Sequence, residues 1–158
     1  MDLLSFVIAA AAALVPNVDH DAVDRAIAQV VTDQPAIFTD DTDRRKTAAL
    51  MIAVAFREST FRLDAIGDQG RSHCAFQINL PGSSKTAEGW SGAELRTDAF
   101  RCVTVGLRML RESVRIDPVF PVAFYARGPR WRTEEARRIS RDRMAIAKRL
   151  SSLVVDEQ

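Results

Sequence analysis

The sequence predicts one mainly α domain with a small β-hairpin or irregular insertion. Apolar residues recur with a helical period through most of the chain, and a Gly/Asp-rich stretch interrupts them after Glu58. The 158 residues are enough for one domain and too few for two of ordinary size. With 47% hydrophobic and 27% charged residues the chain can bury a core, which excludes disorder of the whole. Its 7 Gly, 6 Pro and 2 Cys exclude collagen-like, low-complexity and disulfide-dense classes.

Residues 1–16 are predicted as a segment of their own, followed by the domain proper at 17–158. The segment contains 13 mostly apolar residues, Leu3 to Val15, which is short of the roughly 20 residues that a membrane-spanning helix needs. Its length and its alanines suit the core of an export signal, but the usual basic start is missing and the first charge is Asp2. An atypical export signal and the first helix of the folded domain stay open as two interpretations, and no transmembrane span is expected.

Two helices are predicted before Glu58. The first starts at Asp21, which can cap it, and its apolar residues fall on one face: Val23, Ala26, Ile27, Val30 and Val31. A polar connection over residues 32–43, which contains Pro35, separates it from the second. Residues 47–57 contain nine consecutive apolar residues rich in good helix formers. A helix that is apolar on all sides is a buried one, and this helix runs directly into Glu58.

The chain changes character after Glu58. Residues 64–72 include two Asp and two Gly, and residues 75–78 form a short, mostly apolar run. This combination predicts turns and a small hairpin rather than another helix. A polar loop over residues 81–89 follows.

Helices are predicted again in the second half of the chain. Ser91 and Glu94 have the spacing of a capping box, and an amphipathic helix follows from Asp98. A short helix is predicted from Pro118 to Tyr125, because proline favours the first turn. Thr133 and the two glutamates after it start the final helix. Neither an internal repeat nor a domain linker interrupts this pattern.

Glu58 is the most informative single residue, since an ionisable group at the end of a helix with nine consecutive apolar residues is expected to be partly desolvated. Desolvation raises the pKa of a carboxyl group, and the negative end of a helix dipole acts in the same direction. A carboxylic acid that stays protonated near neutral pH is what glycoside cleavage requires, because the leaving oxygen must receive a proton. The alternative is a structural partner for Arg57 or Arg62, or a glutamate that faces solvent at the helix end.

Three segments carry a resemblance to a known family. Residues 57–61 read Arg-Glu-Ser-Thr-Phe, residues 67–78 read Gly-Asp-Gln-Gly-Arg-Ser-His-Cys-Ala-Phe-Gln-Ile, and residues 123–129 read Ala-Phe-Tyr-Ala-Arg-Gly-Pro. In this order they resemble the catalytic signature of the lysozyme-like superfamily, and above all soluble lytic transglycosylases and goose-type lysozymes. In that family a Glu-Ser pair ends a buried helix, and a turn with glutamine lies close to twenty residues later. Here Gln77 follows Glu58 by 19 residues.

The resemblance implies that Glu58 cleaves peptidoglycan between N-acetylmuramic acid and N-acetylglucosamine, without a cofactor. In a transglycosylase the glutamate protonates the glycosidic oxygen and then withdraws a proton from the muramyl 6-hydroxyl, which closes a 1,6-anhydro ring. A hydrolytic lysozyme or endolysin would need a second carboxylate, for which Asp68 and Asp64 are the near candidates. The favoured alternative for Asp68 is that it hydrogen-bonds its own turn. A further alternative is a catalytically silent module that binds glycan or supports an envelope or phage-tail assembly.

The same resemblance assigns expected roles to further residues. Gln77 would bind an N-acetyl group or a sugar hydroxyl, Tyr125 would line the substrate site and hold the Glu58 carboxyl in place, and Ser59 would position the glutamate. Without the motif, Ser59 merely caps a turn, Gln77 caps a strand end and Tyr125 is a core residue with its hydroxyl at the edge. Three aromatic residues are candidate sugar-stacking surfaces, with the core as the alternative: Phe61, Phe76 and Trp90.

Two positions depart from the family pattern. Cys74 stands where the family usually has glycine, and Ala126 replaces the asparagine that follows the tyrosine. Cys74 and Cys102 are the only cysteines; they either form a disulfide in an oxidising compartment or are two small buried residues. A disulfide would pin the insertion to the following helix. Scattered histidines and cysteines predict no metal site.

The net charge of +1 conceals a gradient along the chain. Residues 1–43 carry eight Asp against Arg25 alone, a charge of −7, whereas residues 127–149 carry nine Lys/Arg against three acidic residues, a charge of +6. The basic part starts within the third motif, so it is expected to flank the cleft and steer an acidic cell wall toward it, chiefly through three arginines of the last helix: Arg137, Arg138 and Arg141.

A nucleic-acid interface is the weaker interpretation, because no recognisable nucleic-acid module accompanies the arginines that would form it. These arginines are Arg130, Arg132, Arg137, Arg138, Arg141, Arg143 and Arg149. We therefore expect peptidoglycan strands as the partner, no nucleic acid, and a monomer. The expected location is the cell envelope, periplasmic or secreted, or a phage lysis or virion protein.

Overall fold

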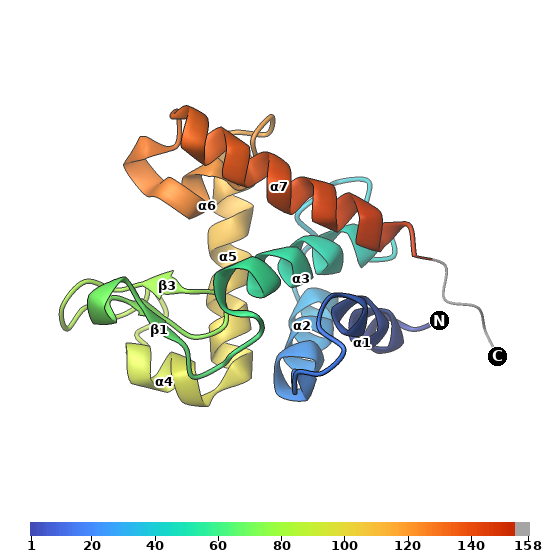
Figure 1. The fold of residues 1–158 in the computed structure, drawn as a ribbon, viewed down its shortest axis with the longest axis horizontal. Helices are drawn as coiled ribbons and strands as arrows, with labels where there is room; N and C mark the ends of the chain where they lie inside the picture. Colours follow the sequence, from blue (N-terminus) through green and yellow to red (C-terminus); the bar gives the residue numbers. More distant parts are fainter. Residues whose placement is uncertain (154–158) are drawn as a thin grey trace.

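The computed structural model describes residues 1–153, so the last five residues of the predicted domain, 154–158, lie outside the description. Within residues 1–153 the chain forms seven α-helices and one small antiparallel sheet, which confirms a mainly α fold with a small β insertion (Figure 1). The helices are α1 Leu3–Leu14, α2 Asp21–Asp33, α3 Arg45–Ser59, α4 Gly92–Thr97, α5 Ala99–Ile116, α6 Ala123–Arg127 and α7 Glu134–Ser151.

Helix α3 is the centre of the fold. It packs against α7 on one side and against α1 and α2 on the other, as Figure 1 shows, and its residues 47–55 are all buried. This follows from the sequence, because a stretch without a polar face has to be covered from every direction. The buried Asp41 carboxylate accepts hydrogen bonds from the amides of Lys46 and Thr47 at 3.0 and 2.7 Å, so it satisfies two amides of the first turn.

Residues 1–16 contain α1, whose buried side chains pack against α2 and α3: Phe6, Val7, Ala10 and Ala11. The Asp2 side chain caps this helix by accepting a hydrogen bond from the amide of Ser5. Helix α2 begins at Asp21 with His20 at the N-cap, so Asp21 is the first helical residue rather than the cap. Across residues 1–153, no helix combines the length and the apolar character that crossing a bilayer demands.

The insertion after α3 contains the sheet. Its strands are β1 Ile66–Gly67, β2 Ser72–His73 and β3 Ile78–Asn79, paired antiparallel in the order β1-β2-β3. A disulfide joins Cys74, in the turn after β2, to Cys102 in α5, with the two Cα atoms 6.2 Å apart. Phe76 packs so closely on α5 that a Cβ atom at Gly106 would lie 2.7 Å from its ring. The insertion is therefore fixed to α5 by a covalent bond and by close packing.

The helices of the second half differ from the prediction at one place. The capping box of Ser91 and Glu94 is formed as predicted and starts α4. The amphipathic helix predicted from Asp98 is α5, and the Asp98 side chain caps it. The predicted helix from Pro118 to Tyr125 is wrong in its bounds, because α6 spans only Ala123–Arg127. The carboxylate of Asp117 accepts hydrogen bonds from the amides of Val119 and Phe120, and this local turn replaces the first helical turn.

Candidate active site

Glu58 lies in the last turn of α3 and borders the cleft that contains all three motifs. The cleft has a volume of about 660 Å³ and lies between the insertion on one side and α5, α6 and α7 on the other. The Glu58 side chain is 22% exposed, so its carboxyl group reaches the cleft from a largely buried position. The residues that line the cleft with it include Gly67, Asp68, Arg71, Gln77, Asn79, Met109, Glu112, Phe124, Tyr125, Arg127, Arg130, Ile139 and Arg143.

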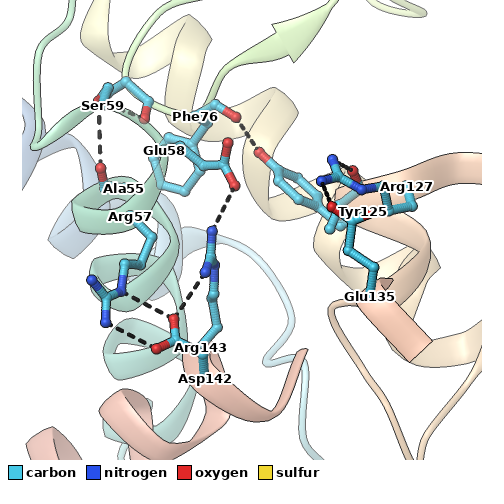
Figure 2. Close-up of polar contacts among 12 residues, drawn as sticks. Ala55, Arg57, Glu58, Ser59, Phe76, Tyr125, Arg127, Glu135, Asp142 and Arg143 are labelled. Atoms are coloured by element: carbon cyan, nitrogen blue, oxygen red, sulfur yellow. Dashed lines mark hydrogen bonds and ion pairs between the residues drawn. The ribbon is translucent and has the colours of Figure 1, made fainter. Parts of the chain in front are cut away.

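The environment of Glu58 favours the protonated acid. Burial raises the pKa of the carboxyl group above its ordinary value, and the charge of Asp68 acts in the same direction. The positive charges of Arg143 and Arg127 oppose the effect without cancelling it. Nη2 of Arg143 lies 3.6 Å from Oε1 of Glu58, which is an ion-pair distance rather than a close hydrogen bond (Figure 2).

Ser59 holds the end of α3 against the insertion. Its hydroxyl donates a hydrogen bond to the carbonyl of Ala75 at 2.8 Å and accepts one from the amide of Arg62 at 3.1 Å. The next residues, Thr60 and Phe61, have φ values of 55° and 61°, so the chain leaves the helix through two left-handed positions. Ser59 therefore fixes where the helix ends relative to the glutamine turn.

Tyr125 makes a different contact from the predicted one. Its hydroxyl donates a hydrogen bond to the backbone carbonyl of Phe76, as Figure 2 shows, and does not hold the Glu58 carboxyl as expected. Burial and the charge of Glu58 raise the pKa of the phenol well above its usual range, so Tyr125 stays neutral. Two buried serines fix the start of α6. Ser113 of α5 accepts a hydrogen bond from the amide of Tyr125, and Ser140 of α7 accepts one from the amide of Val122. Tyr125 is nevertheless part of the cleft wall.

Gln77 lies where the sequence places it, in a strained turn beside the cleft. Its φ is 49°, and its side-chain nitrogen donates a hydrogen bond to the carbonyl of Cys74 at 3.1 Å. A Cβ atom at Gly67 would lie 2.2 Å from Oε1 of Gln77, so only glycine allows this placement. Cys74 has a φ of 65°, in the left-handed region that favours glycine, which is the residue that the resembled motif has there.

Asp68 both serves its own turn and faces the cleft. Its Oδ2 accepts a hydrogen bond from the hydroxyl of Ser72, as expected for a turn aspartate, and the residue is exposed with a φ of 49°. The other candidate second carboxylate, Asp64, is 83% exposed, lies 3.8 Å from Arg62 and is not part of the cleft wall. Asp68 is thus the carboxylate that shares the cleft with Glu58 on the insertion side.

The predicted sugar-stacking role of Phe61 and Phe76 is wrong. The two residues are 1% and 0% exposed, so neither ring face is open to a ligand. The left-handed exit from α3 turns Phe61 into the core, where its ring meets that of His20 at 5.6 Å, and Phe76 fills the space over Gly106. Trp90 packs under the guanidinium of Arg101, at 5.4 Å, and lies outside the cleft wall.

The charged group that faces Glu58 is not among the expected site residues. Arg143, one of the basic residues of the last helix, projects from α7 toward the Glu58 carboxyl, as Figure 2 shows. A signal was available, because Arg143 lies four residues after Ile139 and three before Ile146, the spacing of one helix face. The same helix carries Asp142, which accepts hydrogen bonds from Arg57 and Arg143.

The positive wall of the cleft also differs from the expected one. Four arginines line it, and they come from the insertion, α6, the 3-10 helix η2 (Gly128–Arg130) and α7: Arg71, Arg127, Arg130 and Arg143. The three arginines expected to flank it do not. Arg137 covers the ring of Phe120 at 5.2 Å, Arg141 donates a hydrogen bond to Glu134, and Arg138 is not part of the wall.

Within residues 1–153 no three His, Cys, Asp or Glu side chains gather as a metal site would require. Comparisons of the chain with protein-family models, with curated proteins and with solved structures find no match. The chemistry that the site can perform is therefore inferred from its own residues and their geometry. A buried acid, a glutamine turn, an aromatic wall and four arginines can donate a proton to a polar ligand and attract a negatively charged one.

Proposed function

We propose that this protein cleaves the β-1,4 glycosidic bond between N-acetylmuramic acid and N-acetylglucosamine in peptidoglycan, with Glu58 as the acid. One observation carries the proposal: a largely buried carboxyl group with a raised pKa lies in the last turn of α3, the helix whose residues 47–55 are all buried, and borders a cleft of about 660 Å³. The resemblance to soluble lytic transglycosylases and goose-type lysozymes supports it, because the three resembled segments meet at this cleft.

In the proposed reaction Glu58 works alone. Its proton goes to the glycosidic oxygen as the bond from this oxygen to the anomeric carbon of the muramic acid breaks. The carboxylate left behind takes the proton of the muramyl 6-hydroxyl, and the oxygen of that hydroxyl bonds to the anomeric carbon. The product is a 1,6-anhydro sugar, no water is consumed, and Glu58 is protonated again.

Hydrolysis is the second candidate, and the position of Asp68 in the cleft favours it. Its carboxylate lies on the insertion side of the same cleft, and its charge acts on Glu58. In a hydrolase it would activate water or stabilise the cationic intermediate. Mass spectrometry of the released muropeptides separates the two reactions, since the anhydro product is lighter by one water. Loss of activity in Asp68→Asn together with a reducing-end product would favour hydrolysis.

The decisive experiment compares variants in the clearing of purified cell walls. Glu58→Gln keeps the shape of the side chain and removes the acid, so it should not clear walls. Glu112→Gln is the matched control, because it removes a carboxylate from an exposed position in the same cleft. If Glu58→Gln clears walls as fast as wild type, Glu58 is not the acid, and a glycan-binding or structural module becomes the better proposal.

The proposed setting is the cell envelope, or the lysis or virion apparatus of a phage. The disulfide between Cys74 and Cys102 supports an oxidising compartment. The four arginines of the cleft support an acidic ligand, which peptidoglycan with its peptide carboxylates would be.

A further inference from the structure

Four side chains of alternating charge connect α3 and α7 next to the cleft. They are Arg57, Asp142, Arg143 and Glu58, and together they are called the charge chain. Arg57 donates two hydrogen bonds to Asp142, from Nε at 3.0 Å and from Nη2 at 2.9 Å. Arg143 donates one to the same carboxylate at 2.8 Å and brings its other terminal nitrogen to 3.6 Å from Glu58. Since Arg57 and Glu58 are neighbours in α3, the charge chain leaves that helix and returns to it through α7, as Figure 2 shows.

Arg143 is held by protein groups of the charge chain and has little contact with water. Its side chain is 16% exposed, and its Nε is buried without a hydrogen-bond partner. A guanidinium group keeps its charge at every pH of interest. The permanent positive charge beside Glu58 is therefore partly balanced by Asp142, which is itself held by Arg57.

We propose that Arg143, held by Asp142 and Arg57, is a positioning residue that sets the pH range over which Glu58 acts as an acid. The proposal rests on the proposed function, in which Glu58 must be protonated to start the reaction. Arg143 acts through Glu58 and need not touch the substrate. Its charge favours the carboxylate, and Asp142 weakens that effect by neutralising part of the charge.

The other charged groups around Glu58 do not replace this charge chain. Arg127 of α6 donates hydrogen bonds to the carboxylate of Glu135 and to the carbonyl of Ala126. Asp68, which lies in the 3-10 helix η1 (Asp68–Gly70), carries the opposite charge. Tyr125 stays neutral. Arg71 of the insertion and Glu112 of α5 also line the cleft, but the charges that act most on the pKa of Glu58 are those of Arg143, Arg127 and Asp68.

Two neutral variants should move the titration of Glu58 in opposite directions. Arg143→Gln removes a positive charge that lowers the pKa of Glu58, so this pKa should rise further. Asp142→Asn leaves Arg143 uncompensated, so the pKa should fall by a smaller amount. If Arg143 and Asp142 had a purely structural role, both variants would loosen the packing of α7 against α3. Both would then change activity in the same direction.

The titration is measured directly, by carbon NMR of protein labelled at the glutamate carboxyl carbon, with Glu58→Gln to assign the signal. Arg143→Lys keeps a charge at the position and should shift the pKa less than Arg143→Gln. Arg141→Gln is the matched control, because it removes one arginine from the same helix outside the cleft and should leave the titration unchanged. Thermal unfolding of each variant shows that it is folded.

The pH dependence of wall cleavage is measured beside the titration. The upper limb of the profile should move with the pKa of Glu58, upward in Arg143→Gln and downward in Asp142→Asn. Shifts of both variants in one direction, or no shift, would overturn the proposed role of Arg143. Opposite shifts in the NMR titration without any cleavage of walls would instead reject the proposed function and leave the electrostatic coupling in place.

Discussion

Opening the disulfide between Cys74 and Cys102 should destabilise the protein by a predictable amount. The two cysteines are 28 residues apart in the sequence, so the bond closes a loop of that size in the unfolded chain. Loop-closure entropy for this length corresponds to about 3.5 kcal/mol. For a protein of this size the melting temperature should fall by about 10 °C.

The assay is denaturant unfolding of the oxidised protein, of the reduced protein and of Cys74→Ala/Cys102→Ala. The reduced protein keeps both sulfur atoms, so its difference from the oxidised one isolates the covalent bond. The double variant adds the cost of removing two buried sulfur atoms. Alanine retains the Cβ atom, so the left-handed backbone at position 74 is strained alike in all three.

A difference between oxidised and reduced protein of less than about 1 kcal/mol would refute the entropic argument. It would mean that the unfolded chain already keeps this loop closed. Wall cleavage gives a second measurement, because the turn that the bond holds also receives the side chain of Gln77. We expect the reduced protein to lose activity at temperatures at which it is still folded.

Three further predictions concern single residues. Gly67→Ala places a methyl group against the side-chain oxygen of Gln77, so the rate of wall cleavage should fall about tenfold or more. The free energy of unfolding should change by about 0.5 kcal/mol or less, because the Gln77 side chain can move away. Tyr125→Phe leaves the carbonyl of Phe76 without its hydrogen-bond donor, so the free energy of unfolding should fall by about 1–3 kcal/mol. Since the hydroxyl does not hold the Glu58 carboxyl, the upper limb of the pH profile of wall cleavage should stay where it is in wild type. A shift of that limb would contradict the assignment of the hydroxyl to Phe76. Burial raises the pKa of Asp24 from 3.8 to about 6, so the folded protein binds more protons than the unfolded one in this window and stability should fall as pH rises through it. Urea unfolding from pH 4 to 7 should show this fall in wild type and not in Asp24→Asn.

Much of the fold could be predicted because its signals are local. Nine apolar residues in a row make a buried helix wherever they occur, and the capping residues Ser91 and Asp98 mark helix starts through bonds to amides three residues away. Where a local competitor existed, prediction failed. Pro118 suggested a helix start, but the carboxylate of Asp117 satisfies the next amides as a turn.

The sequence by itself indicated the candidate acid, because Glu58 comes two positions after the apolar run and lies in the first of the three segments that carry the resemblance. Only the tertiary structure decided what surrounds this acid. The left-handed exit of the chain at Thr60 and Phe61 sends an expected sugar platform into the core. The packing of α7 on α3 brings Arg143 to Glu58 across 85 residues of sequence. Such contacts depend on how helices cross and where strained turns point, and no periodicity within a single segment encodes either.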